Sequence, residues 1–374
     1  MLQVPTRHVI FVQDYVPGYR VKFFDELYLS LKSKGTLMDV AVGRAASNQL
    51  KRGDSDRKKR LWKSQIRQVS LGIKSKNIRL RFIPIPRTVS TLIIYEHAIR
   101  NLDVLFMLWA GRRLNKNVKI ALWGHGENFT QKRNALSSKI LLWMLRRCDH
   151  YFVYTPNGEK ALMSKGLPSE KISCVYNSLD TSGISESELS LKCHDVKVVT
   201  YIGGIDAPKG SHLIPAVANM LGTFFPEVRF EILGTGTDFE KVKSRISELN
   251  LRNTTFWGYQ DGAAKHRLLS ESNLLIQPGR VGLSAVESLA YAAPIVTRVN
   301  QLHGPEFEYI KNFELVFELP EDEASFLQGL QKLILNPGQI WLKARKSNSL
   351  RDKFTLQNMV GEFELGILKV LDSE

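Results

Sequence analysis

The residues best suited to bind an anion lie in the second half of the chain, in a glycine-containing loop that directly follows a strand-like run. This loop spans residues 203–210 and carries Gly203, Gly204 and Lys209. Glycines let backbone N–H groups approach an anion, a helix start adds partial positive charge, and the lysine adds a full charge. Ser211 is placed to cap the helix that follows. The loop predicts either a diphosphate site or an ordinary strand-to-helix turn with a solvated lysine.

A second loop of the same kind follows the strand-like run that ends at Gln277. Gly282, Leu283 and Ser284 lie at the start of an alanine-rich helix, where backbone N–H groups have no partner within the helix. Glu287, one turn further on, is placed to accept two hydrogen bonds from the hydroxyls of a ribose. Ser284 and Glu287 also have the spacing of a capping box, in which the glutamate binds a backbone N–H group instead. Both interpretations of Glu287 stay open at this point.

Polar residues follow strand-like runs in the first half as well. His125 lies between two glycines just after the run 119–123, where it is suited to hydrogen bonding or proton transfer near neutral pH. A structural role is the alternative for this histidine. Glu96 and Arg100 follow a neighbouring run, and Gly18 follows the first run of the chain, where backbone could approach a phosphate.

A basic segment, residues 51–81, holds twelve Lys and Arg against two acidic residues. Its part 57–69 predicts a helix with basic residues flanking an apolar side that contains a tryptophan. The apolar side of that helix consists of Leu61, Trp62, Ile66 and Val69. Such a helix suits the interfacial zone of an anionic membrane, with a solvated loop as the alternative.

Length and composition are those of a globular protein. The 374 residues are 43% hydrophobic and 24% charged, which excludes collagen, coiled coil and wholesale disorder. The cysteines, Cys148, Cys174 and Cys193, lie far apart, which argues against a disulfide framework or a zinc site. The sequence contains no apolar run of about 18 residues, and the first apolar run is too brief for a signal peptide. We therefore expect a soluble, cytoplasmic protein.

The positive charge is concentrated in the first half. Residues 1–180 carry 32 Lys and Arg against 13 Asp and Glu, whereas residues 181–374 carry 20 against 24. The first half favours an anionic partner, such as nucleic acid, an anionic membrane or a phosphorylated substrate. A nucleic-acid-binding element of recognisable type is missing, so nucleic acid is not the expected partner.

These candidate residues require a scaffold of alternating strands and helices. Strand-like runs occur at 8–12, 38–42, 81–85, 92–95, 119–123, 150–154 and 172–176, then at 196–202, 228–233, 254–257, 273–277, 294–297 and 315–317. Helical periods fit between the first set at 19–33, 102–114, 137–147 and 158–165. This alternation is typical of βαβ units on parallel sheets. We predict an α/β fold with two Rossmann-like domains, residues 1–185 and 186–354, and a final helix within 355–374 that packs back on the first domain.

The ordered set of motifs resembles the retaining glycosyltransferases of family 4, whose GT-B fold has two Rossmann-like domains facing a central cleft. The matching motifs are Lys209-Gly210, Leu233-Gly-Thr-Gly236, Phe256-Trp-Gly258, Pro278–Pro294 and Gly304-Pro-Glu306. The first half is similar to a subgroup that builds bacterial capsule, exopolysaccharide and lipopolysaccharide. Its matching motifs are Glu96-His-Ala-Ile-Arg-Asn101, Trp123-Gly-His-Gly126 and Asn177-Ser-Leu-Asp180. The resemblance covers nearly the whole chain and is densest from Tyr201 to Pro305.

The resemblance implies roles for particular residues. Lys209 matches the lysine that contacts the donor diphosphate, Glu287 the glutamate that holds the nucleotide ribose, and His125 the histidine beside the transferred sugar. These three are the expected catalytic residues. The expected donor-binding set is Gly18, Gly203, Gly204, Lys209, Tyr259, Arg280, Gly282, Leu283 and Glu287, with Tyr259 where the base is held. The expected acceptor-side residues are Glu96, Arg100 and Asn128.

Two positions depart from the family pattern. The first glutamate of the family's Glu-x7-Glu motif falls on Gly279, and its phosphate-binding arginine falls on Gly204. Arg280 is placed to compensate for the missing arginine. Because the first glutamate is missing, the family does not tell which sugar the donor carries.

The resemblance implies a metal-independent hexosyltransferase that uses a nucleotide sugar, such as a UDP- or GDP-sugar, and no cofactor. It would transfer the sugar to a lipid-linked or lipopolysaccharide glycan during surface polysaccharide synthesis. Its expected partners are this donor, a glycan or glycolipid acceptor and an anionic membrane surface, at the inner face of the cytoplasmic membrane. The two departures leave a second hypothesis, a catalytically inactive nucleotide-sugar-binding or scaffold homologue.

Overall fold

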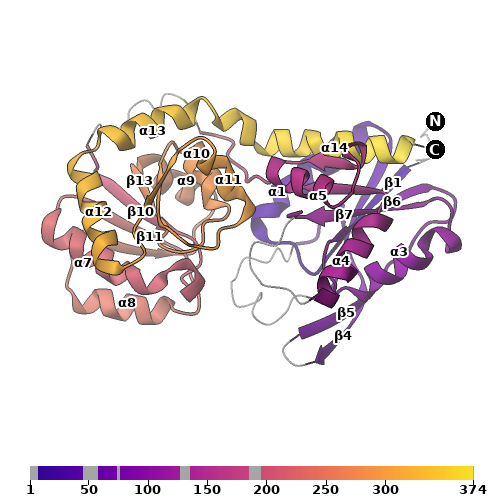
Figure 1. Cartoon of the computed structure of the whole chain (residues 1–374), viewed down its shortest axis with the longest axis horizontal. Coiled ribbons are helices and arrows are strands. Elements are labelled where there is room, and N and C mark those ends of the chain that lie inside the picture. The colour runs from indigo at the N-terminus through magenta and orange to yellow at the C-terminus, as the bar shows by residue number, and fades with distance from the viewer. Residues whose placement is uncertain (1–6, 45–57, 74–75, 127–134, 185–194, 374) are drawn as a thin grey trace. The chain divides into compact units, whose positions relative to one another are not determined.

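A computed structural model describes residues 7–44, 58–73, 76–126, 135–184 and 195–373 of the chain. The chain forms two compact units, Met1–Asp180 with Leu356–Glu374, and Thr181–Thr355. Each unit is built around a parallel sheet with helices on its faces (Figure 1), so the expected two-domain α/β fold is confirmed. The division at Asp180 falls within the polar stretch that follows the last strand of the first unit.

The sheet of the first unit has seven parallel strands in the order β3-β2-β1-β6-β7-β8-β9. These strands are β1 Arg7–Gln13, β2 Thr36–Val42, β3 Lys63–Gln65, β6 Ser90–Glu96, β7 Val118–Gly124, β8 His150–Val153 and β9 Ile172–Cys174. The helices are α1 Val21–Ser33, α3 Leu102–Leu114, α4 Ala135–Arg147, α5 Pro156–Ser164 and α14 Leu356–Asp372, with 3₁₀ turns η1 Gly18–Arg20 and η2 Ser169–Lys171. The central strands read as continuous apolar runs because helices cover both faces of the sheet.

Two apolar cores pack against the first sheet. One contains Phe11 of β1 with Phe23 of α1 and Phe363 of α14, and the other contains Tyr95 of β6 with Val104 of α3. The helix α14, drawn in yellow beside α1 in Figure 1, therefore completes the core of the first unit although it is the last helix of the chain.

The sheet of the second unit has six parallel strands in the order β12-β11-β10-β13-β14-β15. These strands are β10 Val198–Ile202, β11 Arg229–Leu233, β12 Thr254–Gly258, β13 Leu274–Ile276, β14 Ile295–Arg298 and β15 Val316–Leu319. The helices are α7 Ile214–Phe224, α8 Phe239–Glu248, α9 Gly262–Glu271, α10 Ser284–Ala290, α11 Glu308–Lys311, α12 Glu323–Leu335 and α13 Gly338–Asn348. The 3₁₀ turns are η3 Ala207–Lys209, η4 Ser211–Leu213, η5 Pro305–Phe307 and η6 Arg351–Phe354.

Each sheet has one place where the direction of strand addition reverses. In the first unit this place is between β1 and β6, and in the second it is between β10 and β13. Loops on either side of such a reversal diverge, so ligands of open α/β sheets bind there, beyond the carboxyl ends of the strands. The loop 203–210 follows β10 and the loop 277–283 follows β13. The two loops singled out in the second half therefore flank the reversal of the second sheet.

The helix predicted over residues 57–69 is wrong. In the described part of this segment, residues 63–65 form the edge strand β3, and β4 Arg67–Ile73 begins two residues later. Trp62 is only 1% exposed, packs on Phe24 at 5.2 Å between ring centroids, and donates from Nε1 to Asp25 at 2.7 Å. The tryptophan is therefore a core residue and not part of an exposed apolar helix face.

The strand expected at residues 81–85 also differs. Residues 76–82 form β5, Lys76–Phe82, which pairs antiparallel with β4 in a separate two-stranded sheet. Its side chains alternate between two environments, with Arg79 and Arg81 buried and Leu80 and Phe82 exposed. The alternation of arginines with apolar residues thus marks a β-ribbon that projects basic side chains inward.

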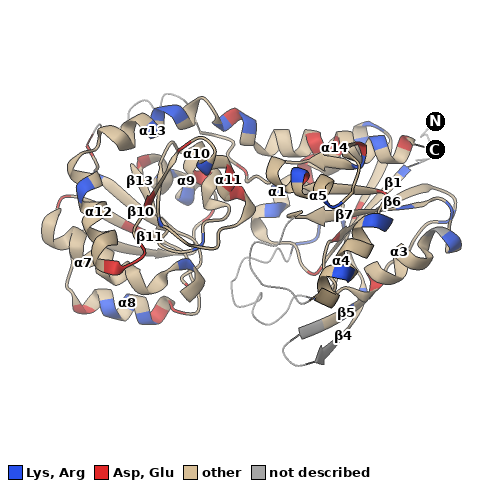
Figure 2. Cartoon of the chain, viewed as in Figure 1, with Lys and Arg blue, Asp and Glu red and all other residues tan. Residues whose placement is uncertain are grey.

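Charge is distributed differently over the two units. Figure 2 shows Lys and Arg alternating with Asp and Glu along α8 in the second unit, whereas the charged residues of α4 in the first unit are all Lys or Arg. Among the described residues, no helix is long and apolar enough to cross a membrane.

Candidate functional site

The loops after β10 and β13 are joined by Lys209. Its Nζ donates to the backbone oxygen of Arg280 at 2.8 Å, and the backbone N–H of Arg280 donates to the oxygen of Pro208 at 2.9 Å. The ammonium group also lies beside Gly282, where an added β-carbon would be 3.8 Å from Nζ. Lys209 is thus brought to the backbone that starts α10, as the anion-site prediction requires.

Burial, together with the nearby charge of Arg280, lowers the pKa of Lys209 to about 8. Three carboxylates, Glu306, Glu287 and Asp206, oppose this shift. A partly desolvated ammonium next to another cation gains from an anionic ligand, because the ligand supplies the counter-charge that the protein provides only partly.

Backbone N–H groups at the start of α10 are available to an anion. In the described part of the chain, no acceptor is found for the N–H groups of Gly282, Leu283 and Ser284, whereas Ala285 bonds back to the oxygen of Gly282. Gly304 approaches from the loop after β14, and its N–H donates to the oxygen of Val281 at 2.7 Å. The predicted donors Gly282 and Leu283 are therefore placed next to Lys209.

Glu287 forms an ion pair that the sequence did not indicate. Its carboxylate accepts from Nζ of Lys265 on α9, and the side chains of the two residues are 8% and 25% exposed. Burial alone lowers the pKa of Lys265, but the charge of Glu287 outweighs it, so the pKa is raised. Glu287 is therefore an acceptor that the ion pair with Lys265 holds in place.

Both helix caps expected from the sequence are absent at these loops. Leu283 is the N-cap of α10 and has no side-chain cap bond, and Ser284 Oγ donates to Oε1 of Gln277 at 3.4 Å. The capping-box interpretation of Glu287 is therefore wrong. Ser211 likewise does not cap its helix, because its Oγ donates to Asp238 at 2.6 Å.

Gln277 holds the two loops together. Its Nε2 donates to the backbone oxygen of Ile202 at the end of β10, and its Oε1 accepts from Ser284 at the start of α10. Gly203, with a φ of 138°, lies against the same side chain, 3.7 Å from Nε2 as measured from an added β-carbon. A side chain at position 203 would be strained, so a glycine is needed for the loop to pass this buried amide.

The two departures from the family pattern have different surroundings. At Gly279 a β-carbon would lie 2.5 Å from the backbone nitrogen of Gly210. At Gly204 it would lie 2.6 Å from Oδ2 of Asp206, a side chain fixed by bonds from Thr237. At position 279 the backbone of Gly210 leaves no room for a side chain. At position 204 the nearest group is only the side chain of Asp206.

Arg280 lies beside the site but its Nε is committed elsewhere. The Nε donates to the oxygen of Leu302 at 2.9 Å, and the side chain is only partly buried. Its charge still acts on Lys209 and His303. Arg280 thus adds positive charge near Lys209, and its compensation for the family's missing arginine stays a prediction.

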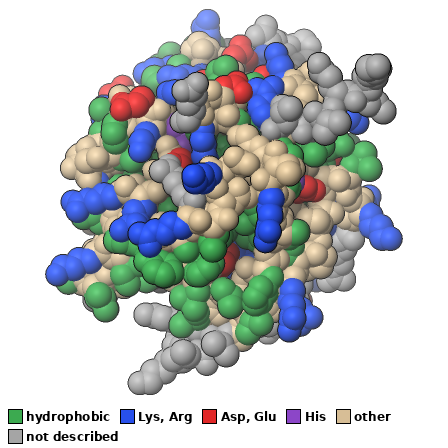
Figure 3. Space-filling view, turned by 90° about the vertical axis from the view of Figure 1, so that its right-hand side faces the viewer, with side chains coloured by type: hydrophobic (Ala, Val, Ile, Leu, Met, Phe, Trp, Pro, Cys, Tyr) green, Lys and Arg blue, Asp and Glu red, His purple; other side chains and the backbone are tan. Residues whose placement is uncertain are grey.

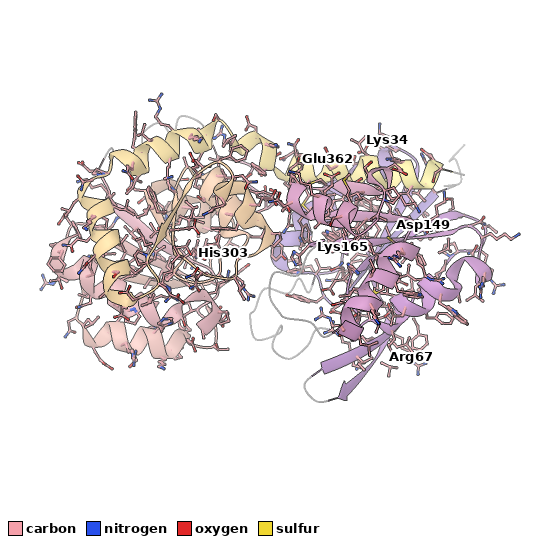
Figure 4. The ribbon with its side chains drawn as sticks, in the orientation of Figure 1. Lys34, Arg67, Asp149, Lys165, His303 and Glu362 are labelled. Carbon is pink, nitrogen blue, oxygen red and sulfur yellow. The ribbon has the colours of Figure 1, made fainter. Side chains whose placement is uncertain are left out.

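His303 is a site residue that sequence reasoning missed. It follows β14 (Figure 4), its Nδ1 accepts from the N–H of Val281 at 3.1 Å, and its ring stacks on Phe307 at 3.7 Å between centroids. Burial, with the charges of Lys209, Lys311 and Arg280, lowers its pKa to about 4. His303 is therefore neutral at pH 7 with the proton on Nε2. Its position directly before Gly304-Pro-Glu306 was the available signal.

Tyr259 follows β12 and is 46% exposed. Its hydroxyl lies near enough to influence Lys265. The structure thus brings Lys209, Arg280, Gly282 and Glu287 together at the strand reversal, with Tyr259 on the Lys265 side. No signal in the sequence singled out Lys265, since a lysine on a solvent-facing helix is ordinary.

In the first unit, His125 follows β7 and is exposed. Its ring lies against Tyr154 at 5.0 Å, and Lys165, labelled in Figure 4, donates to the oxygen of the next residue, Gly126, at 2.7 Å. Gly126 has a φ of 73°, and a β-carbon there would lie 2.6 Å from the oxygen of Gly158. The glycine after His125 is needed because the loop packs directly on the start of α5.

The other first-unit candidates lie at the carboxyl end of the same sheet. Glu96 and Arg100 form a half-exposed ion pair at 3.0 Å. Gly18 is exposed at the start of η1, while Arg20 is buried and donates to Asn177 at 2.5 Å. Asn128, the remaining predicted acceptor-side residue, lies outside the described residues.

Comparison with known proteins gives the class. Residues 186–351 match the family model "Glycosyl transferases group 1". The chain is 22% identical over 204 residues to the lipopolysaccharide 1,6-galactosyltransferase of Salmonella typhimurium, covering 52% of this chain and 54% of that protein. The match thus spans about half the length of this curated relative.

Two solved structures are similar over nearly their whole length. A mutant of S. aureus TarM in complex with fondaparinux, alpha-GlcNAc-glycerol and UDP has a TM-score of 0.62 at 13% identity, covering 98% of this chain and 100% of that one. Anabaena HepE in complex with UDP has a TM-score of 0.63 at 13% identity, covering 96% and 98%. The fold is that of the GT-B glycosyltransferases. Residues 186–351 are thus similar to the group 1 glycosyltransferases, in agreement with the family 4 motifs in the sequence.

Proposed function

We propose that this chain is a retaining hexosyltransferase that moves a sugar from a nucleotide-sugar donor to a glycan acceptor in surface polysaccharide synthesis. The observation that carries the proposal is the convergence of Lys209, the N–H groups of Gly282 and Leu283, and the carboxylate of Glu287 at the strand reversal of the second sheet. These groups match a nucleoside diphosphate in chemistry, since cation and N–H donors suit phosphate and a carboxylate suits ribose hydroxyls.

The proposed chemistry relies on stabilising the diphosphate that leaves the sugar. Negative charge grows on the diphosphate as the bond to the sugar breaks, and Lys209 with the backbone N–H groups would neutralise it without a metal ion. Glu287 would hold the ribose and so fix the position of the phosphates. His125 would contact the transferred sugar and contribute to turnover more than to donor affinity.

The donor is proposed to be a UDP- or GDP-sugar. Two of the similar structures contain UDP, which favours uracil as the base. The acceptor is proposed to be a lipid-linked or lipopolysaccharide glycan, supported by the similarity to the Salmonella galactosyltransferase. The excess of Lys and Arg in residues 1–180 suits a negatively charged acceptor and a peripheral place at the inner face of the cytoplasmic membrane.

A thermal-shift screen tests donor binding. A ligand that binds only the folded chain raises its melting temperature, by an amount that increases with concentration over Kd. We expect UDP- or GDP-sugars to raise the melting temperature of the wild-type chain and to have no effect on Lys209→Ala. Turnover with a lipid-linked acceptor then separates an enzyme from the inactive homologue, which would bind donor without consuming it. No shift with any nucleotide would contradict both.

A further inference from the structure

The solvent-facing side of α3 is apolar, contrary to the usual pattern of a surface helix. Leu102, Phe106 and Trp109 lie one helical turn apart and are 40%, 50% and 58% exposed, and Leu114 at the helix end is 70% exposed. The rings of Phe106 and Trp109 are in contact, 6.4 Å between centroids. Single exposed apolar residues need no explanation, but a continuous stripe does.

The inner side of α3 is fixed to the first unit. Val104 and Leu108 lie in the core, and Asp103, only 4% exposed, accepts from Nε of Arg81 at 3.0 Å. A second buried ion pair joins Arg79, next along β5, to Asp14 at the end of β1. The helix therefore presents its apolar stripe as a rigid surface, with the ribbon β4–β5 held beside it.

Positive charge accompanies the stripe. Arg113 lies over the ring of Trp109 at 6.0 Å, and Lys116 is exposed just beyond the helix. Residues 63–82 and 97–118 together contain ten Lys and Arg, of which Arg79 and Arg81 are buried, and one acidic residue, the buried Asp103. The outer side of the ribbon has the same composition, since Arg67 lies over Phe82 at 5.8 Å and both are exposed.

Figure 3 shows hydrophobic side chains gathered in the lower part of one face of the molecule, with Lys and Arg side chains around them. Aromatic and leucine side chains bordered by arginine and lysine suit the boundary between headgroups and acyl chains, where rings enter and cations stay at the headgroups. A second copy of the chain is a poorer occupant, because it would bring two basic surfaces together. We propose that the α3 surface (Leu102, Phe106, Trp109, Arg113, Leu114 and Lys116) docks on an anionic lipid bilayer.

This inference rests on the proposed function, in which the enzyme is peripherally bound to the cytoplasmic membrane, and it names the surface that contacts the membrane. It replaces the helix expected over residues 57–69, whose tryptophan is buried. A rigid docking surface on the first unit would concentrate the enzyme where a lipid-linked acceptor is located. The step is binding alone and needs no donor, so it can be measured apart from catalysis.

Co-sedimentation of the full chain with vesicles tests the proposal. We expect binding to phosphatidylglycerol-containing vesicles in 0.1 M salt, weaker binding in 1 M salt, where the Debye length falls to about 3 Å, and little binding to pure phosphatidylcholine. Phe106→Ser with Trp109→Ser should reduce vesicle affinity at least tenfold. Arg113→Gln and Lys116→Gln should each reduce it about fivefold. Leu29→Ser on α1, where Leu29 is 64% exposed, and Lys34→Gln are the matched controls and should bind like wild type.

Unchanged binding of the Phe106/Trp109 double variant, or equal binding to neutral vesicles, would overturn the proposal. Sedimentation velocity tests whether a second copy of the chain covers this surface instead. A wild-type dimer that becomes monomeric in the double variant would show a contact between copies and overturn the proposal. The vesicles contain no sugar nucleotide or glycan, and the melting shift with UDP is measured on the same variants. If the double variant loses vesicle binding but UDP still raises its melting temperature, the substitutions have impaired the docking surface alone. If the wild-type chain binds vesicles but UDP does not raise its melting temperature, only the proposed transferase activity is contradicted.

Discussion

Gly279 packs on Gly210 so closely that a β-carbon at position 279 would lie 2.5 Å from the backbone nitrogen of Gly210. The same hypothetical atom would lie 2.5 Å from the carbonyl carbon of Lys209. The position where the family has its first motif glutamate is therefore filled here by the backbone that carries Lys209. This glycine is part of how the Lys209 loop is seated and not an isolated loss of a side chain.

We therefore expect Gly279→Glu to impair the protein and not to restore a family-type donor site. The new side chain must displace the loop 208–210, which should lower the free energy of unfolding by about 1–3 kcal/mol and weaken donor binding. Chemical denaturation and donor titration measure the two effects. Gly338→Ala is the control, because a β-carbon there meets no atom within 4 Å. Tighter donor binding in Gly279→Glu would show that the loop has room for the side chain.

Donor affinity should depend on pH through Lys209. Its pKa of about 8 in the free protein means that the ammonium loses its proton above pH 8, whereas an anionic donor binds the protonated form. Affinity should thus be constant below about pH 7.5 and fall by up to tenfold per pH unit above 8. Calorimetry in buffers of different ionisation enthalpy should detect proton uptake on binding in that range.

Lys209→Gln provides the control for this pH dependence. Its donor affinity should be lower than that of wild type at pH 7 and should not change between pH 7 and 9.5. A nucleoside without phosphate should also show a flat profile. If Lys209→Gln retains the wild-type dependence, another group titrates and the assignment to Lys209 is wrong.

The Lys265–Glu287 ion pair predicts coupled effects on donor binding. Glu287→Gln removes the carboxylate proposed to accept from the ribose and should cost about 1.5–3 kcal/mol of donor binding energy. Lys265→Met should cost less, because it leaves the carboxylate in place but less firmly held. Isothermal titration of both single variants and the double variant gives the coupling energy.

Glu271→Ala is the control for this pair, since Glu271 pairs with Arg229 where both are about half exposed. It should change stability by less than about 1 kcal/mol and leave donor affinity as in wild type. Wild-type donor affinity in Glu287→Gln would exclude the ribose role.

His125 and His97 should respond differently to replacement by alanine. His125→Ala should lower turnover while the donor dissociation constant stays within about twofold of wild type, since the histidine is assigned to the sugar and not to the nucleotide. His97 bonds to the hydroxyl of Tyr151 at 3.0 Å and to the oxygen of Leu141 at 3.2 Å, so His97→Ala should lower stability by about 1–3 kcal/mol. Steady-state kinetics measures the turnover of both variants, and thermal denaturation measures their stability. Wild-type turnover in His125→Ala would leave that residue a structural role only.

The sequence alone determined the α/β class and most of its elements, because continuous apolar strands and amphipathic helices leave different local periods. The segment 102–114 is a helix with the expected bounds, and the strands before Lys209 and before Gly282 lie within two residues of their predicted ends. Loops that follow parallel strands share one sheet edge, so Lys209 and Glu287 could be assigned to one site without knowing the fold in detail.

The tertiary structure decided which partner each side chain has. Whether Glu287 caps its own helix or pairs with Lys265 depends on how α9 packs beside α10, and the two residues are separated by more than a helix in sequence. Trp62 lies in the turn just before the edge strand β3, and its neighbours in sequence fit an exposed helix equally well. Its contacts with Phe24 and Asp25, which only folding brings together, show that it is buried. Local periodicity records how apolar and polar residues alternate within one segment. Burial and ion pairing arise between segments that meet only after folding, so the spacing within one segment does not encode them.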